Sequence, residues 1–191
     1  TRLITMDLHA DQEQGFFNVP VDHLYASSVL LPYIQSLNLK NLVIATPDVG
    51  GSKRASSYAK YLDCPMVLCN KTRKKANEVD SMQIIGDVKG KRAIIVDDLV
   101  DTAGTLCNGA KAVLEVGGAT EVYACATHAV LSGPAIERIK NSAIKEVILL
   151  DTIPVPEDKM IDKFTVLPTA PIFAEAIARI YNDKPFTAAF S

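Results

Sequence analysis

The sequence has no tryptophan among its 191 residues, few aromatic side chains and only three histidines. Its four cysteines, Cys64, Cys69, Cys107 and Cys125, form no Cys-x-x-Cys pair. A zinc site is therefore not expected, and we predict reduced, mostly buried thiols in a cytoplasmic protein. No apolar run is long enough to cross a membrane, and residues 1–7 do not resemble a signal peptide.

An excess of charge of either sign is also lacking, because 20 Lys and Arg stand against 22 Asp and Glu, the net charge is −2 and the sequence pI is about 5.9. This balance excludes a broad basic face for nucleic acid. The one basic cluster, residues 71–75, would by itself be a solvated loop. Apolar residues make up 48% of the chain, which is enough for a sizeable core. We expect one domain over residues 1–191, cut from a longer protein because the chain does not begin with Met.

Apolar runs of strand length alternate along the chain with amphipathic stretches of helix length. Strands are predicted at residues 3–6, 42–45, 66–69, 82–85, 93–96, 122–126, 147–150 and 164–167. Helices are predicted at 24–37, from the turn at 47–51 to about 62, from 104 to 116, at 135–140 and at 172–181. Asp22 is a possible cap of the first helix. This pattern favours an α/β fold with a mostly parallel sheet flanked by helices.

Polar residues follow several of the predicted strands. They are Asp7 and His9, then Asp48, then Lys71 and Arg73, and finally Asp97, Asp98 and Asp101. In open α/β sheets, ligands bind at the carboxyl ends of the strands. We therefore expect these side chains to meet at one edge of the sheet.

The segment Asp101-Thr102-Ala103-Gly104-Thr105 leads from the central strand into a helix. Small residues let the backbone approach a ligand closely. The first N–H groups of a helix lack helical partners, and the helix dipole favours an anion. A segment of this kind can also be a plain helix cap, but its position after a strand indicates a site for a monoester phosphate.

Two adjacent carboxylates, Asp97 and Asp98, precede this segment. Alone, such a pair can be a solvated strand end. Beside a phosphate site, the pair can accept hydrogen bonds from vicinal sugar hydroxyls or hold a magnesium ion that does. The combination points to a pentose 5-phosphate.

The segment at 96–105 resembles the ribose-phosphate loop of the type I phosphoribosyltransferases, and the whole chain resembles the ribose-phosphate diphosphokinase family. The resemblance is carried, in order, by Asp7-Leu8-His9-Ala10-Asp11-Gln12, residues 15–22, Pro47-Asp48-Val49-Gly50-Gly51, Asn77, residues 85–88 and Ser132-Gly133-Pro134-Ala135. It implies transfer of a diphosphoryl group from Mg²⁺-bound ATP to ribose 5-phosphate, giving phosphoribosyl pyrophosphate and AMP. It also implies a homo-oligomer.

The same resemblance implies roles for single residues. His9, Asp48 and, more weakly, Asp7 would be magnesium ligands near the ATP phosphates. Lys71 and Arg73 would be the catalytic cations of a mobile loop, with Arg73 also reaching ribose 5-phosphate. Ribose 5-phosphate would otherwise be bound by Asp97, Asp98, Asp101, Thr102, Ala103, Gly104 and Thr105.

The chain also departs from the family pattern. Asn18 stands where a carboxylate is common, and Thr72 stands where a basic residue is common. Members of the family have a further N-terminal domain of similar fold, so we expect this chain to be the C-terminal half and to have little or no activity by itself. Two alternatives remain open here: a non-catalytic regulatory relative, and a salvage phosphoribosyltransferase.

Overall fold

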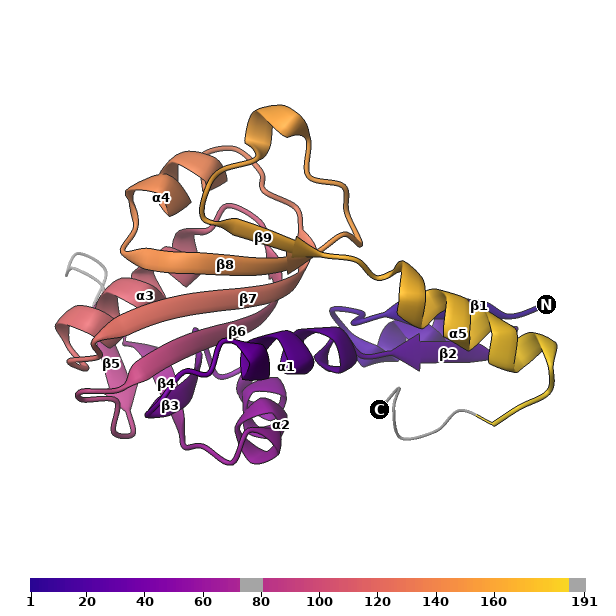
Figure 1. Ribbon diagram of the computed structural model, residues 1–191, viewed down its shortest axis with the longest axis horizontal. Helices are drawn as coiled ribbons and strands as arrows, with labels where there is room; N and C mark the ends of the chain where they lie inside the picture. Colours follow the sequence, from indigo (N-terminus) through magenta and orange to yellow (C-terminus); the bar gives the residue numbers. More distant parts are fainter. Residues whose placement is uncertain (73–80, 186–191) are drawn as a thin grey trace.

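The computed structural model describes residues 1–72 and 81–185 (Figure 1). In chain order, the elements are β1 (Leu3–Met6), a short 3-10 helix η1 (Asp11–Phe16), β2 (Val21–Leu24), α1 (Ser27–Ser36), β3 (Leu42–Thr46), α2 (Ser52–Tyr61), β4 (Met66–Thr72), β5 (Ser81–Ile85), β6 (Arg92–Val100), α3 (Gly104–Glu115), β7 (Glu121–Ala129), α4 (Ala135–Asn141), β8 (Ile144–Leu150), the 3-10 helix η2 (Glu157–Lys159), β9 (Phe164–Leu167) and α5 (Ala170–Tyr181).

A seven-stranded sheet forms the body of the molecule, in the order β5-β4-β3-β6-β7-β8-β9. Neighbouring strands run parallel throughout, except that β5 pairs antiparallel with β4. The predicted α/β class with a mostly parallel sheet is therefore confirmed. Because β3 and β6 are adjacent and parallel, the segments that follow them emerge side by side at the same edge of the sheet.

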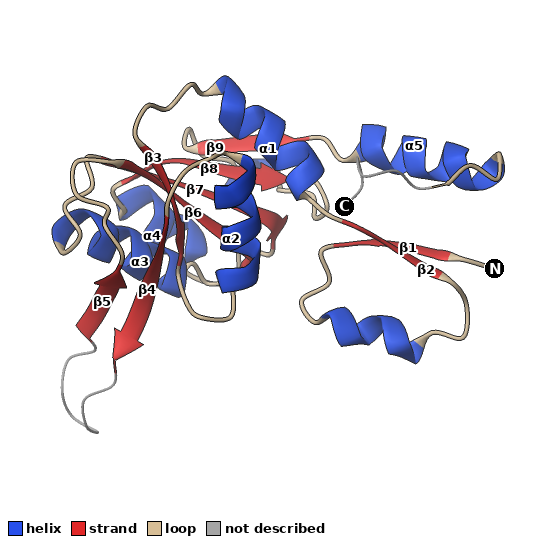
Figure 2. Cartoon of the chain, turned by 90° about the horizontal axis from the view of Figure 1, so that it is seen from below, coloured by secondary structure: helices blue, strands red, loops and turns tan. Residues whose placement is uncertain are grey.

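The buried strands alternate their side chains between two cores. In β6, Ala93 and Ile95 belong to one apolar cluster and Ile94 and Val96 to the other. The first cluster includes residues of α3 and α4, and the second includes residues of α1 and α2, so the helices cover both faces of the sheet (Figure 2). The side-chain period of two in a strand thus explains why the apolar runs are continuous.

The N-terminal strand lies outside the main sheet. β1 pairs in parallel with β2, and the two stand apart from the seven-stranded sheet beside α5 (Figures 1 and 2). The predicted helix at 24–37 is present, but its predicted start at residue 24 and its cap by Asp22 were wrong. Residues 21–24 pair with β1 as a strand, and Asp22 forms an ion pair with Arg2 at 2.7 Å. The helix itself begins at Ser27.

Two further findings bear on the sequence predictions. The central strand is longer than expected, because β6 continues through both aspartates to Val100 by pairing with β7. The four cysteines are free, and Cys69 and Cys125 are buried. Within residues 1–72 and 81–185, no helix has the length and apolar character needed to span a membrane.

Candidate functional site

A pocket at the carboxyl edge of the sheet brings together many of the residues singled out above. It has a volume of about 270 Å³ and is lined by His9, Asp48 and residues 97–106. We call it the sheet-edge pocket. The side chains come from three different parts of the chain: the segment after β1, the turn after β3 and the end of β6.

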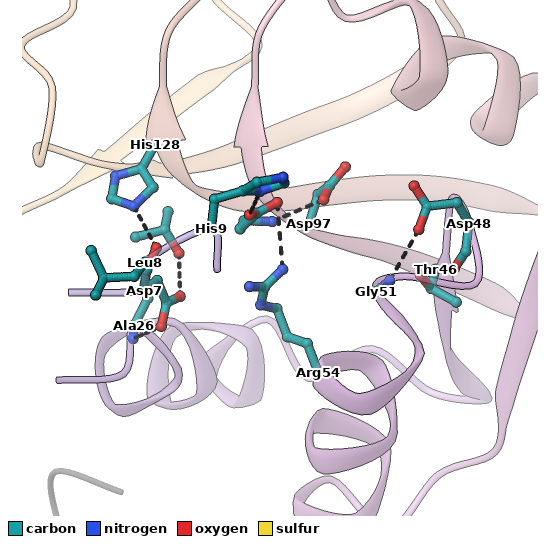
Figure 3. A network of polar contacts seen from close by, with 12 residues as sticks. Asp7, Leu8, His9, Ala26, Thr46, Asp48, Gly51, Arg54, Asp97 and His128 are labelled. Carbon is teal, nitrogen blue, oxygen red and sulfur yellow. Dashed lines mark hydrogen bonds and ion pairs between the residues drawn. The ribbon is translucent and has the colours of Figure 1, made fainter. Parts of the chain in front are cut away.

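The Asp97–Asp98 pair is placed by β6, and both residues line the sheet-edge pocket. Asp98 is 6% exposed. Its Oδ2 accepts a hydrogen bond of 2.6 Å from His9 Nδ1, and its Oδ1 lies 3.6 Å from Arg54 Nη1. Asp97 Oδ1 accepts from the backbone N–H of Asp98 at 2.9 Å. Asp98 is thus held by the side chains of His9 and Arg54, whereas Asp97 has a backbone partner (Figure 3).

The two carboxyl groups consequently differ in acidity. Burial, and then the neighbouring Asp98 carboxylate, raise the pKa of Asp97 to about 7. Burial also acts to raise the pKa of Asp98, but hydrogen bonds from His9 and from Asp97, together with the charge of Arg54, outweigh it and lower that pKa. The hydrogen bond to Asp98, followed by its negative charge, raises the pKa of His9. At neutral pH the Asp97–Asp98 pair therefore consists of an ionised Asp98 carboxylate beside an Asp97 carboxyl that is close to its midpoint.

The turn from β6 into α3 supplies backbone N–H groups. Ala103, the residue before α3, has φ of 58°, a left-handed conformation that is uncommon for alanine. The first helical bond of α3 runs from Cys107 N–H to the Ala103 carbonyl. Within the described part of the chain, the N–H groups of residues 102–105 have no backbone acceptor. They are therefore available to an anion at the helix N-terminus.

Asp48 is positioned by the tight turn between β3 and α2. Its Oδ1 accepts a hydrogen bond from Gly51 N–H at 3.0 Å, and its carbonyl accepts from the Thr46 hydroxyl at 2.8 Å. A Cβ on Gly51 would lie 2.5 Å from Thr46 Oγ1, so the turn requires glycine there. The turn leaves Asp48 at the rim of the sheet-edge pocket, with one carboxylate oxygen used internally.

Asp7, expected above as a weaker magnesium ligand, is held by donors of the protein itself. It is 6% exposed, its Oδ1 accepts from Ala26 N–H at 3.3 Å, and its Oδ2 accepts from the Thr127 hydroxyl at 2.6 Å. Its carbonyl contacts His128 Nε2 at 2.9 Å (Figure 3). Both carboxylate oxygens therefore bind protein donors, and Asp7 does not line the sheet-edge pocket. Its position, with φ of 42°, instead fixes the backbone that carries His9.

The pocket residues can hold magnesium only if a bound phosphate and water supply the remaining ligands. Among the described residues, no three His, Cys, Asp or Glu side chains converge as a metal-binding group. Mg²⁺, however, is usually bound through one or two carboxylates, several waters and substrate phosphates. In His9, the Nδ1 atom contacts Asp98, which leaves Nε2 for a ligand. His9 and Asp48 therefore fit an ion whose remaining ligands come from phosphates and water.

The two predicted catalytic cations are only partly placed. Lys71 belongs to β4, and its backbone pairs with Met82, but its side chain lies outside the described part. Arg73 falls outside the described residues altogether. Sequence reasoning missed Arg54, which reaches Asp98 from α2, and Thr127 and His128, which hold Asp7 from β7. No motif marks these three residues, because their partners are at least 44 positions away in the chain.

Comparisons with known proteins identify the family of this chain. Residues 67–191 match the family described as the phosphoribosyl synthetase-associated domain. A ribose-phosphate pyrophosphokinase from Clostridium acetobutylicum is 54% identical over 191 residues, which is 99% of this chain and 60% of the relative. One from Porphyromonas gingivalis is 55% identical over 188 residues, covering 98% of this chain and 59% of the relative. The chain therefore spans about three fifths of the length of these curated relatives.

Solved structures show a similar fold. The crystal structure of phosphoribosylpyrophosphate synthetase from Mycobacterium smegmatis has a TM-score of 0.87 and 38% identity, covering 95% of this chain and 59% of that one. Orotate phosphoribosyltransferase from Aeropyrum pernix has a TM-score of 0.50 at 20% identity, covering 80% of this chain and 75% of that one. The second likeness concerns the fold alone.

Proposed function

Because this chain belongs to the phosphoribosyl synthetase-associated domain family, we propose that it carries the ribose 5-phosphate site of a ribose-phosphate pyrophosphokinase, the enzyme also called ribose-phosphate diphosphokinase. The observation that carries the proposal is the sheet-edge pocket, where free N–H groups at the start of α3 lie next to the Asp97–Asp98 pair. The N–H groups suit a phosphate, and the carboxyl groups suit sugar hydroxyls.

The substrate orientation follows from these two parts. The 5-phosphate takes the N–H groups and hydroxyls of residues 101–105, and the first of the two vicinal ribose hydroxyls donates to Asp98. Asp97, with its pKa near 7, accepts from or donates to the second hydroxyl. This orientation leaves the anomeric hydroxyl toward the open side of the pocket, where His9 and Asp48 lie. There it attacks the β-phosphorus of ATP, with AMP leaving.

Electrostatics explain why a cation is part of the proposal. The pocket is lined by four aspartates, at positions 48, 97, 98 and 101, and by His9, but by no lysine or arginine among the described residues. A phosphate dianion and a nucleoside triphosphate would be repelled by so many carboxylates. His9 and Asp48 would hold Mg²⁺, which when bound neutralises phosphate charge. Lys71 and Arg73 would add positive charge from the end of β4, as catalytic groups beside the transferring phosphates.

The alternatives are less well supported. A non-catalytic relative would not be expected to keep His9, Asp48, Lys71 and Arg73 together. A salvage phosphoribosyltransferase would share the fold. However, this chain is only 20% identical to the solved orotate phosphoribosyltransferase, whereas it is 54% identical to the Clostridium acetobutylicum ribose-phosphate pyrophosphokinase. Because the curated relatives have further length outside the alignment, we propose ribose 5-phosphate binding as the property of this chain by itself. Turnover, cytoplasmic location and homo-oligomeric assembly are proposed for the whole enzyme.

The test is a calorimetric titration of the chain with ribose 5-phosphate, with and without Mg²⁺. We expect saturable binding, no detectable binding of ribose, and tighter binding when Mg²⁺ is present. D98A removes the acceptor for the sugar hydroxyls and should abolish binding, whereas D63A, at the turn after α2, should leave it unchanged. Equal affinity for ribose and ribose 5-phosphate would refute the proposal.

A further inference from the structure

Behind the turn into α3 lies a second cavity, which the proposed reaction does not use. It has a volume of about 750 Å³ and is lined by residues of α3 and α4, among them Lys111 and Arg138. Gly104 lines both this cavity and the sheet-edge pocket. The two cavities therefore border the same turn of backbone.

Arg138 crosses from α4 to that turn. Its Nη1 donates a hydrogen bond of 2.9 Å to the carbonyl of Thr102. Among the described residues, Arg138 has no carboxylate within ion-pair distance. Its contact with the turn is therefore with a backbone dipole, and its charge is not neutralised by an acidic neighbour.

We propose that Arg138 is a positioning residue that sets the orientation of the Thr102–Ala103 peptide and so aims the Ala103 N–H at the bound phosphate. In a trans peptide the carbonyl and the N–H point in opposite directions. The guanidinium holds the Thr102 carbonyl toward the cavity between α3 and α4. The N–H of Ala103 consequently points to the other side, where Ala103 lines the sheet-edge pocket. This inference rests on the proposed function for the identity of the anion.

The peptide needs such a partner because the helix does not supply one. The first helical bond of α3 accepts at the Ala103 carbonyl, so the Thr102 carbonyl stays outside the helix. Ala103 also holds a left-handed φ of 58°, which costs energy for a residue with a Cβ and persists only when its surroundings fix it. If the peptide rotated, a carbonyl oxygen would face the phosphate and repel it.

Gly104 gives the guanidinium its space. A Cβ at this position would lie 3.3 Å from Arg138 Nη1, which is close enough to press on the hydrogen-bonded group. The glycine of the Thr-Ala-Gly-Thr turn thus serves two sides at once. It allows a ligand to approach from the sheet-edge pocket, and it lets Arg138 reach the carbonyl from behind.

The experiment compares R138M with K111M. Both variants lose one positive charge from the lining of the same cavity, but Lys111 does not contact the turn; it forms an exposed ion pair with Glu115 at 3.9 Å. We expect R138M to weaken ribose 5-phosphate binding about tenfold and K111M by less than twofold, with R138K restoring part of the affinity. If R138M and K111M weaken binding equally, the effect is one of charge alone and the inference is overturned.

A second readout separates this inference from the proposed function. The Ala103 amide resonance, followed by NMR without ligand, should move in R138M and R138Q and stay in place in K111M. An unchanged Ala103 resonance in both Arg138 variants overturns the positioning role. If the unsubstituted chain fails to bind ribose 5-phosphate while the Ala103 resonance still moves, the proposed function fails and the peptide orientation by Arg138 stands.

Discussion

Replacing Asp97 by asparagine should make the ligand-free protein more stable at alkaline pH. The fold raises the pKa of this carboxyl from 3.8 to about 7, first because the group is buried and then because Asp98 lies beside it. The native state therefore binds this proton more tightly than the unfolded chain does. Stability is consequently lost as the pH rises from about 4 to about 7, and an amide that cannot ionise avoids this loss.

The size of the effect follows from the same values. A rise from 3.8 to about 7 corresponds to a ceiling of about 4 kcal/mol between the two protonation states. Relaxation of the open pocket reduces this figure, and we expect D97N to gain about 2 kcal/mol in free energy of unfolding at pH 8. The amide oxygen can still accept the hydrogen bond from Asp98 N–H, so the local geometry is retained.

The assay is urea unfolding followed by circular dichroism at several pH values between 4 and 8. The advantage of D97N should be largest at pH 8 and should vanish near pH 4. D98N is the matched control, and it should have the opposite sign. Its carboxylate has a lowered pKa because His9 and Arg54 stabilise the charge, so D98N should be less stable than the parent at pH 7. A D97N advantage that does not change with pH would refute the reasoning.

Three other substitutions test the fold around the site. K163M should lower the free energy of unfolding, measured by urea titration, by about 1 to 2 kcal/mol. The reason is that Lys163 Nζ donates to three carbonyls at the end of α4 at 2.7–3.1 Å. Unchanged stability would show that these contacts contribute nothing. In the parent, hydrogen bonds from Lys145 and Arg92 lower the pKa of Glu121 to about 2. The parent should therefore be more stable than E121Q at pH 7 and should lose this advantage as the pH falls from 4.5 toward 2. An advantage that persists at about pH 2 would contradict this. D7A leaves two buried donors, Ala26 N–H and the Thr127 hydroxyl, without their acceptor. It should lower the free energy of unfolding, measured by thermal unfolding, by about 2 to 4 kcal/mol, and D7N should lower it less. Equal losses in D7A and D7N would argue against the hydrogen-bond network.

Much of the sheet could be predicted from the sequence because its strands are buried on both faces. Runs such as residues 93–96 are continuous in apolar character, and only a strand between two layers of helices uses such a run fully. The turn into α3 was recognisable for a related reason. Its small residues and hydroxyls follow a strand and precede a helix, and this position is typical of a phosphate-binding turn.

The errors have physical causes as well. Residues 21–24 read apolar, polar, polar, apolar directly before a helix, so nothing local separates a short strand from the first turn of that helix. The contacts of Asp7 could not be predicted from the sequence either, because Thr127 and His128 reach it across about 120 positions. Arg138 escapes prediction in the same way, since its contact with Thr102 depends on the packing of α4 against α3.

The most direct test of the account is a crystal structure of this chain with ribose 5-phosphate. We predict that the phosphate lies within hydrogen-bond distance of the N–H groups of residues 102–105 and that the ribose hydroxyls contact Asp97 and Asp98. A phosphate seated instead between α3 and α4, or a sugar whose hydroxyls avoid both aspartates, would contradict it.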